Sequence, residues 1–150
     1  MDIRPAHPTD IPQLLSLIRR YWDFEGITGF DALRIELVLQ QLLAGSAAAG
    51  AIWVAESHGT IEGYLIVVLF MSVEHRGLMG EIDEFFVLPE ARSRGTGAHL
   101  LAAAEAALLR RGCVRLQLQL ATGNASAREF YQHRGYRARA GYELLDKQLP

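Results

Sequence analysis

The sequence predicts an α/β fold in which helices cover both faces of one central sheet. Segments whose apolar residues alternate with a period of two are separated along the chain by segments whose apolar residues recur every three to four positions. Strands separated by helices in this way favour a layered sheet. With 150 residues, of which 50% are hydrophobic and 21% charged, the chain can bury one sizeable core, and we expect a single domain over residues 1–150.

The first third of the chain predicts one strand and two helices. The strand covers Ile3–Pro5, and a helix begins at Asp10 with Pro12 in its first turn, where a proline is tolerated. Leu14 and Ile18 belong to the apolar face of this helix. A loop, a second helix and a stretch of small, flexible residues are then expected over 23–30, 31–44 and 45–50, respectively.

The rest of the chain predicts a hairpin, a long strand, and then helices alternating with strands. The tetrapeptide Ser57-His58-Gly59-Thr60 has the composition of a hairpin turn. The helix after Gly97 ends at Gly112, and its core stripe is Leu100, Leu101, Ala104 and Leu108. The expected strands cover 51–57, 61–71, 80–88 and 114–120, with one or two more within 136–149; the expected loop covers 72–79, and the expected helices run to residue 111 and over 124–134.

A basic turn with two glycines separates the strand that ends before Pro89 from the following helix. Gly95 and Gly97 allow the backbone to turn tightly and to approach a ligand closely. The N–H groups at the start of the helix and its dipole favour an anion. The segment lacks the lysine of a P-loop and the third glycine of a dinucleotide fingerprint. The residues alone therefore predict a phosphate-binding turn, with an ordinary strand-to-helix turn as the alternative.

Two motifs resemble those of the GNAT superfamily of N-acyltransferases. The pattern R-x-x-G-x-G after V-x-P, within residues 87–97, is similar to the acyl-coenzyme A signature of that superfamily. Residues 124–136 resemble its second motif, N-x-x-A-x-x-F-Y followed by a G-[FY] turn. The resemblance covers residues 78–136 closely and the whole chain loosely. It implies a single N-acetyltransferase domain with a mixed central sheet of six to seven strands and helices on both faces.

The resemblance also implies acetyl-CoA as the co-substrate. In the family the amides of the turn hold the coenzyme A pyrophosphate, and a strand amide near Val87 positions the pantetheine arm and contacts the oxygen of the tetrahedral intermediate. Asn124 would hydrogen-bond the pantetheine arm, and Tyr131 would protonate the departing thiolate. The alternatives are that Asn124 is a plain helix cap and that Tyr131 is an aromatic residue at the edge of the core. The residues expected to bind the cofactor are Phe86, Val87, Arg92, Ser93, Arg94, Gly95, Thr96, Gly97, Ala98, Asn124 and Tyr131.

Three carboxylates, those of Glu81, Asp83 and Glu84, lie within an otherwise apolar strand. Burial and mutual repulsion raise the pKa of a carboxyl group toward the range useful for a general base. In a regular strand Glu81 and Asp83 share one face while Glu84 points to the other, so we expect Glu81 or Asp83 to be catalytic. Histone acetyltransferases of the superfamily carry their base at the position that matches Glu81, and spermidine/spermine acetyltransferases carry a Glu at that of Asp83. The alternative is that these acids pair with arginines or are solvated.

The expected acceptor is a primary amine of a small molecule or a peptide, and the expected reaction is direct transfer in a ternary complex. Such an amine is protonated near neutral pH and must lose a proton before it attacks a thioester. In the family, the first two helices with their loop and the loop between the third and fourth strands set substrate choice. Aromatic and acidic residues there would suit a cation. The alternative is that the aromatic residues complete the apolar face of the first helix and the acids are solvated. The candidate acceptor-binding residues are Tyr21, Trp22, Asp23, Glu25 and His75.

Composition argues against several other classes of function. The formal net charge of −2 gives no reason to expect a nucleic acid partner, and a single cysteine, Cys113, leaves no internal disulfide and no cysteine-based metal cluster. The histidines have no spacing that suggests a metal site. The longest apolar run, Tyr64–Met71, is too short to cross a membrane, and the first residues form no signal peptide, so we expect a soluble, cytoplasmic protein. Relatives often form homodimers, and we expect the same here.

Two other functions fit the same motifs. A non-catalytic acyl-CoA-binding sensor would keep the turn and lose the acid and the base. A transferase for a longer acyl group or a hydroxyl acceptor would need a roomier acyl pocket near Phe85 and Phe86. Thiol release measured across amines and acyl-CoAs separates these functions from acetyl transfer.

Overall fold

The structure is a computed structural model that describes residues 1–44 and 49–150. The chain forms two compact units, Met1–Leu118 and Gln119–Pro150. Of the flexible stretch expected after the second helix, residues 45–48 lie outside the described residues.

The first unit is built on one five-stranded sheet, in which the strands lie in the order β1-β2-β3-β4-β5. Neighbouring strands are antiparallel except for β4 and β5, which run parallel, so the prediction of a mixed sheet is confirmed. The strands are β1 (Asp2–Pro5), β2 (Gly50–Ser57), β3 (Thr60–Ser72), β4 (Gly77–Val87) and β5 (Cys113–Leu118).

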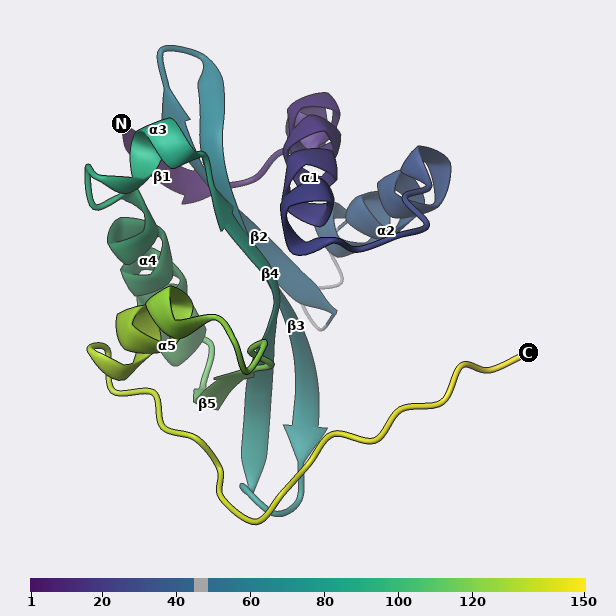
Figure 1. Ribbon diagram of the computed structural model, residues 1–150, viewed down its shortest axis with the longest axis vertical. Coiled ribbons are helices and arrows are strands. Elements are labelled where there is room, and N and C mark those ends of the chain that lie inside the picture. Colours follow the sequence, from purple (N-terminus) through teal and green to yellow (C-terminus); the bar gives the residue numbers. More distant parts are fainter. Residues whose placement is uncertain (45–48) are drawn as a thin grey trace. The chain divides into compact units, whose positions relative to one another are not determined.

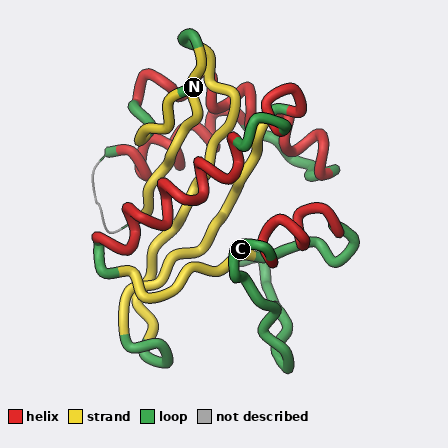
Figure 2. The backbone as a smooth tube through the Cα atoms, turned by 90° about the vertical axis from the view of Figure 1, so that its left-hand side faces the viewer, coloured by secondary structure: helices red, strands yellow, loops and turns green. Residues whose placement is uncertain are grey.

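Helices cover both faces of this sheet, as the sequence predicts, with α1 and α2 on one side and α4 on the other (Figure 1). Figure 2 shows α4 running diagonally across the strands. The helices of this unit are the 3-10 helix η1 (Pro8–Asp10), α1 (Ile11–Glu25), α2 (Ala32–Leu43), α3 (Pro89–Arg92) and α4 (Thr96–Arg110). Two glycines let the layers approach closely: a Cβ on Gly50 would meet Leu42 of α2, and one on Gly63 would meet Leu100 of α4.

The helical stripes read from the sequence are the surfaces that attach these helices to the sheet. Leu14 and Ile18 of α1 are buried, since at most 2% of each residue is exposed. The predicted stripe of α4 is also at most 2% exposed and consists of Leu100, Leu101, Ala104 and Leu108. Removal of these apolar surfaces from water is the main contribution that holds the two helices in place.

Two element boundaries differ by more than two residues from the sequence-based expectation. The helix α1 continues to Glu25 and stops at Gly26, whose φ of 69° ends the helix in the left-handed conformation, so the loop expected from residue 23 starts later. The loop expected over 72–79 is shorter, because β3 extends to Ser72 and β4 begins at Gly77. Hydrogen bonding across this hairpin extends the ladder beyond the residues that look apolar.

The expectation of six to seven strands is wrong, because the sheet has five. The second unit has the helix α5 (Ala125–Gln132) and, in the part of the chain that the structure describes, no strand. Gly135 turns the backbone with a φ of 87° just before the segment expected to form strands, and Gly141 turns it with a φ of 82° within that segment. A strand needs a neighbouring edge with which to pair its backbone groups, and this segment pairs with none among the described residues.

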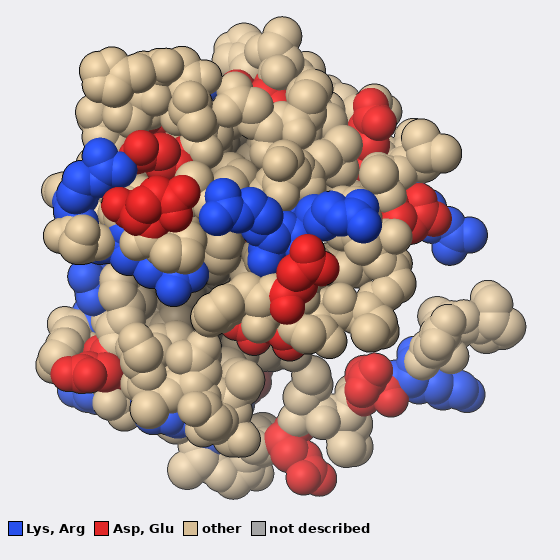
Figure 3. Space-filling view, turned by 45° about the horizontal axis from the view of Figure 1, so that its top comes forward, with Lys and Arg blue, Asp and Glu red and all other residues tan. Residues whose placement is uncertain are grey.

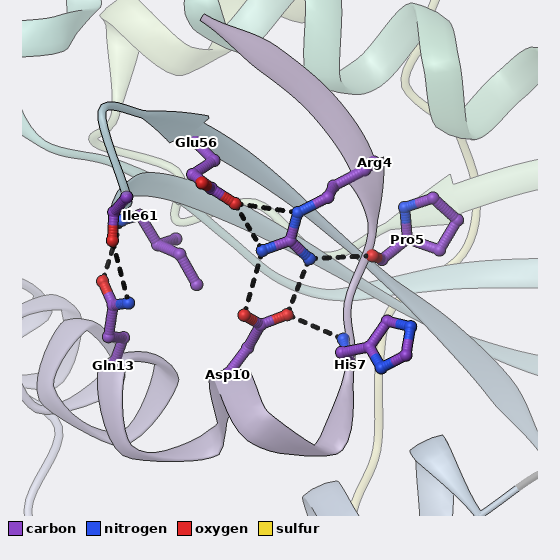
Figure 4. Close-up of polar contacts among 8 residues, drawn as sticks. Arg4, Pro5, His7, Asp10, Gln13, Glu56 and Ile61 are labelled. Atoms are coloured by element: carbon purple, nitrogen blue, oxygen red, sulfur yellow. Dashed lines mark hydrogen bonds and ion pairs between the residues drawn. The ribbon is translucent and has the colours of Figure 1, made fainter.

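An ion-pair cluster ties the first strand to the start of α1 (Figure 4). The guanidinium of Arg4 donates two hydrogen bonds to the carboxylate of Asp10, at 2.8 and 3.0 Å, and two to Glu56 of β2, at 2.9 and 2.6 Å. The Asp10 side chain is only 8% exposed and also accepts the backbone N–H of His7, at 2.7 Å. The hydrogen bonds from Arg4 are the largest cause that lowers the pKa of Asp10.

We expect replacement of Arg4 by Met to destabilise the fold by about 2 kcal/mol, because it leaves the buried Asp10 carboxylate without its cation. Arg34→Met is the matched control: this arginine, 86% exposed, pairs with Asp31 on the surface and should contribute less than about 0.5 kcal/mol. Urea unfolding measures both variants. Equal midpoints for Arg4→Met and the wild type would contradict a structural role for the cluster.

None of the helices in the described residues is both long and apolar enough to span a membrane. Within the same residues, no group of three or more His, Cys, Asp or Glu side chains is arranged to hold a metal ion.

Candidate functional site

A bulge in β4 decides where the acidic side chains point. Ile66 of β3 pairs with Glu84, and the next residue, Val67, pairs with Ile82, so Asp83 is the extra residue of a β-bulge. Residues directly opposite in a ladder share a face, and Glu81 pairs with Val68, two residues from Ile66. Glu81 and Glu84 therefore lie on the same face. The regular-strand expectation that Glu84 points away from Glu81 is wrong because of this extra residue.

Glu84 lies on the sheet face covered by α1 and is half-buried. Its Oε1 accepts the indole Nε1–H of Trp22, at 2.6 Å, and its Oε2 accepts the hydroxyl of Tyr64, at 2.8 Å. Burial raises the pKa of Glu84, the two hydrogen bonds lower it, and the charge of Asp83 raises it, with a net increase. The sequence did not single out Tyr64, although a hydroxyl within the apolar run of β3 is a signal that a polar partner is buried nearby.

Asp83 and Glu81 differ in the freedom of their carboxylates. Asp83 is exposed and has no hydrogen-bond partner among the described residues. Protein around the carboxylate first, and the charge of Glu81 second, raise the pKa of Asp83 above its usual value. Glu81 is half-buried, and its Oε2 accepts the amide N–H of Gln117 from β5, at 2.6 Å. The free proton acceptor of the pair is Asp83.

The second half of β4 has an edge that β5 does not cover. β5 pairs only with the part of β4 from Leu78 to Ile82, whereas β4 continues to Val87. The N–H of Leu88 donates to Glu62 of β3, at 2.8 Å, so by the alternation of an antiparallel ladder the N–H and C=O of Val87 point away from β3. This strand end offers a main-chain donor to a ligand laid along it.

The glycine-rich turn between α3 and α4 presents its main chain rather than its side chains. The N-cap of α4 is Gly95, with φ 75°. The N–H groups in the first turn of a helix have no intrahelical partner, and Gly95 has no side chain that could accept a hydrogen bond from them. Thr96 is fully buried, and its hydroxyl donates to the carbonyl of Ala91, at 2.9 Å. Ser93 and Gly95 are exposed, and Gly97 and Ala98 are half-exposed. This geometry suits an anion held by backbone donors.

Both arginines of the turn are engaged by protein groups. The Nε–H of Arg92 donates to the Val87 carbonyl, at 2.9 Å, and its guanidinium lies over the rings of Phe24 and Phe86, at 5.3 and 5.6 Å from their centroids. Arg94 forms an ion pair with Glu62, at 2.9 Å. On the face that Figure 3 shows, basic side chains (blue) and acidic side chains (red) lie near one another. The positive charge of the arginines is therefore partly compensated.

The end of α1 supplies most of the candidate acceptor residues. Tyr21 packs on Phe86 with ring centroids 5.8 Å apart. Burial first, and then the charges of neighbouring carboxylates, including those of Glu84 and Asp83, raise the pKa of Tyr21 to about 12, so its hydroxyl stays protonated near neutral pH. Asp23 and Glu25 are exposed on the same helix.

His75 lies apart from the other candidates. It belongs to the tight turn between β3 and β4, where its N–H donates to the hydroxyl of Ser72, at 3.1 Å. Figure 1 shows this turn and α3 at opposite ends of β4. The structure does not bring His75 to the acidic bulge with the residues of α1.

The second unit carries the two remaining candidates, Asn124 and Tyr131. The side chain of Asn124 caps α5 by accepting the N–H of Ala127, at 3.0 Å. The ring of Tyr131 packs edge-on against Phe130 and Tyr136, at centroid distances of 5.2 and 5.3 Å. The cap and the two ring contacts fix both side chains on a short helix.

Comparison with known proteins identifies a family. The sequence model of the acetyltransferase (GNAT) family matches residues 11–136, which is most of the chain. An uncharacterized N-acetyltransferase of Archaeoglobus fulgidus is 36% identical over 133 residues, which cover 87% of this chain and 89% of that protein. The uncharacterized N-acetyltransferase YhfO of Bacillus subtilis is 29% identical over 143 residues, which cover 95% of this chain and 93% of that protein.

Solved structures show the same fold. One example is the aminoglycoside acetyltransferase AAC(6')-Iy in complex with a bisubstrate analogue, CoA-S-monomethyl-acetylneamine. It superposes with a TM-score of 0.83 at 19% identity and covers 99% of this chain and 98% of that one. The similarity covers nearly the whole length of both chains, so the arrangement of strands and helices described above is that of a known fold.

Proposed function

Because the chain belongs to the acetyltransferase (GNAT) family, we propose that it transfers an acetyl group from acetyl-CoA to a primary amine, directly and in a ternary complex. The observation that carries this proposal is the free carboxylate of Asp83 at the bulge of β4. The same strand leads, a few residues later, into the turn with unpaired main-chain donors. One element thus presents a proton acceptor and, at its end, a site for an anion.

The turn would hold the diphosphate of coenzyme A. The backbone N–H groups in the first turn of α4 have no intrahelical partner, Gly95 beside them is exposed, and the helix dipole favours negative charge there. The uncovered edge of β4 would take the pantetheine arm, with the N–H of Val87 as a donor to the thioester oxygen. Asn124 would bind the same arm, by the match of its motif to the family.

The chemical step needs one proton acceptor and one proton donor. Asp83 would take a proton from the ammonium form of the acceptor, directly or through a water, and the amine nitrogen would then attack the thioester carbon. The N–H of Val87 would stabilise the tetrahedral oxyanion, and the carbon–sulfur bond would break as the intermediate collapses. Tyr131 would give its proton to the departing thiolate, and the second proton of the amine nitrogen, lost as the amide forms, would pass through water to the tyrosinate. We favour Asp83 over Glu81 as the base because the carboxylate of Glu81 is engaged by Gln117.

The acceptor class that fits best is a small cationic amine. The carboxylates of Glu81 and Asp83 lie together at the bulge, and the aromatic ring of Tyr21 from α1 lies near Asp83, a combination that attracts an ammonium group through charge and ring contacts. An aminoglycoside is one such amine, and the structural relative named above is an aminoglycoside N-acetyltransferase. Linear polyamines are a second example.

A panel assay tests the function. Release of free thiol from acetyl-CoA is followed with aminoglycosides, linear polyamines, amino acids and lysine peptides as acceptors, and acetyl-CoA binding is measured separately by calorimetry. The proposal expects binding, and turnover that is fastest with multiply charged amines. Binding without thiol release from any acceptor would instead favour a coenzyme A sensor. Faster turnover with a longer acyl-CoA would contradict acetyl as the group transferred.

Replacement of Gly95 by Ala should weaken acetyl-CoA binding about tenfold, because an L-residue at φ 75° is strained and the turn would reshape its donors. Gly112→Ala is a matched control: Gly112 takes φ 83° at the other end of α4, where a Cβ meets nothing within 4 Å. It should lose similar stability and keep its affinity. Equal affinities of the two variants, measured by calorimetry, would argue against the turn as the diphosphate site.

A further inference from the structure

The proposed chemistry leaves Glu84 unused, although it lies on the acidic strand. Its two carboxylate oxygens accept hydrogen bonds from two neutral donors, Trp22 at 2.6 Å and Tyr64 at 2.8 Å. A carboxylate engaged at both oxygens is poorly placed to take a proton from an amine. What it does instead is join three elements: α1 through Trp22, β3 through Tyr64, and its own strand β4.

The two donors depend on Glu84 to different degrees. An indole N–H can only donate, so Trp22 needs an acceptor at position 84. Tyr64 is fully buried, and burial, followed by the charge of Glu84, raises the pKa of its hydroxyl, which stays neutral. A hydroxyl can donate or accept, so Tyr64 would tolerate a neutral amide in place of the carboxylate. The bond that strictly requires Glu84 is the one to α1.

Trp22 lies near the end of α1, where the candidate acceptor residues are found. The preceding residue, Tyr21, packs on Phe86 of β4, and the Trp22 ring meets the ring of Phe30 edge-on at 5.6 Å. Phe30 lies just before the start of α2. The bond between Glu84 and Trp22 therefore fixes the helix end and the segment that leads to the next helix.

We propose that Glu84 is a positioning residue for the acceptor: its hydrogen bonds to Trp22 and Tyr64 hold the aromatic end of α1 over the bulge of β4, so that the amine is presented to Asp83. This inference rests on the proposed acetyl transfer. It assigns Glu84 no contact with the thioester and no proton transfer. Its effect should appear in acceptor binding rather than in the chemical step or in acetyl-CoA binding.

Steady-state kinetics with Glu84→Met and Glu84→Gln separate positioning from charge. The Met variant removes both acceptors and should raise the acceptor KM about tenfold, with kcat and the KM for acetyl-CoA within about threefold of the wild type. The Gln variant can accept from Trp22 and donate to Tyr64, and should keep the acceptor KM within about threefold. A Gln variant as impaired as the Met variant would assign the effect to charge and overturn positioning.

A double-mutant cycle with Trp22→Phe tests whether Glu84 acts through the indole. Trp22→Phe alone should raise the acceptor KM about as much as Glu84→Met, and the double variant should stay within about twofold of the worse single variant. Additive effects would overturn the proposal. Because Trp22→Phe keeps an aromatic ring and removes only the donor, it also carries the test if the Met variant does not fold.

The indole resonances give a readout that does not depend on activity. The chain has two tryptophans, and Trp22→Phe assigns their two indole N–H signals. The Trp22 signal should move as Glu84 titrates, with a midpoint above about 4.3, the usual pKa of Glu, and Glu84→Gln should abolish the movement. An unmoved signal would overturn the contact. A wild type that turns over no amine would contradict the proposed function itself, whereas an active wild type with additive variants would contradict positioning alone.

Discussion

Replacement of Tyr131 by Phe should lower kcat about a hundredfold and leave acetyl-CoA affinity within about threefold of the wild type. The phenol proton is the one that the departing thiolate needs, and a phenylalanine ring cannot supply it. The substitution keeps the ring that packs against Phe130 and Tyr136, so α5 should be preserved. Thiol release at saturating acetyl-CoA and amine measures kcat, and calorimetry measures the affinity.

Tyr142→Phe is the control for this substitution, because Tyr142 is 70% exposed and carries no proposed role. It should turn over as fast as the wild type. Equal turnover in Tyr131→Phe would remove Tyr131 from the mechanism and leave a water or the solvent as the proton donor. A loss of affinity that matches the loss of kcat would make the residue a binding group instead.

Replacement of Asp83 by Asn should lower kcat/KM about a hundredfold at neutral pH, because the amide cannot take a proton from the ammonium form of the acceptor. Asp83 has no hydrogen-bond partner among the described residues, so the change should remove a proton acceptor and break no structural bond. Asp146→Asn is the control: it removes an exposed acid that carries no proposed role, and its effect should be no more than about threefold.

The role of Asp83 as a base also predicts the direction in which activity changes with pH. A carboxylate base works when it is deprotonated, so activity falls as the pH drops through its pKa. The protein around the carboxylate and the charge of Glu81 raise the pKa of Asp83, and the acid limb of kcat/KM should therefore lie above about 3.9, the usual pKa of Asp. Asp83→Asn should lose this limb and recover with rising pH as the free amine forms. If Glu81→Gln loses the limb and Asp83→Asn keeps it, Glu81 is the base.

The parts of the fold that local pattern specifies could be predicted from the sequence. The stripe of α4, the hairpin of β2 and β3, and the helical cover on both faces follow from periodicity and turn residues. Residues 136–149, all of which the structure describes, form no strand, and this could not be predicted because the sequence does not show whether a pairing edge is available. The end of α1 was also missed, because Gly26 stops that helix only after the acids that look like loop residues.

The candidate site depends on tertiary pairing, which the sequence does not show. The acids of β4 are visible as carboxylates in apolar sequence, but their shared face comes from one unpaired residue in the ladder with β3. The partners of Glu84 lie 62 and 20 residues away along the chain, on α1 and β3. By contrast, the turn after β4 could be predicted apart from the short helix α3, because Pro89, the glycines and the start of α4 are all local.

Backbone amide shifts recorded while acetyl-CoA is added test the central claim most directly, namely that the main chain at the start of α4 and at the end of β4 holds the thioester nucleotide. We predict the largest changes at the N–H groups of Gly95, Thr96, Gly97 and Ala98, together with that of Val87, and only small changes at the matched Gly112 end of the helix. Saturable binding that left these five signals in place would contradict the account.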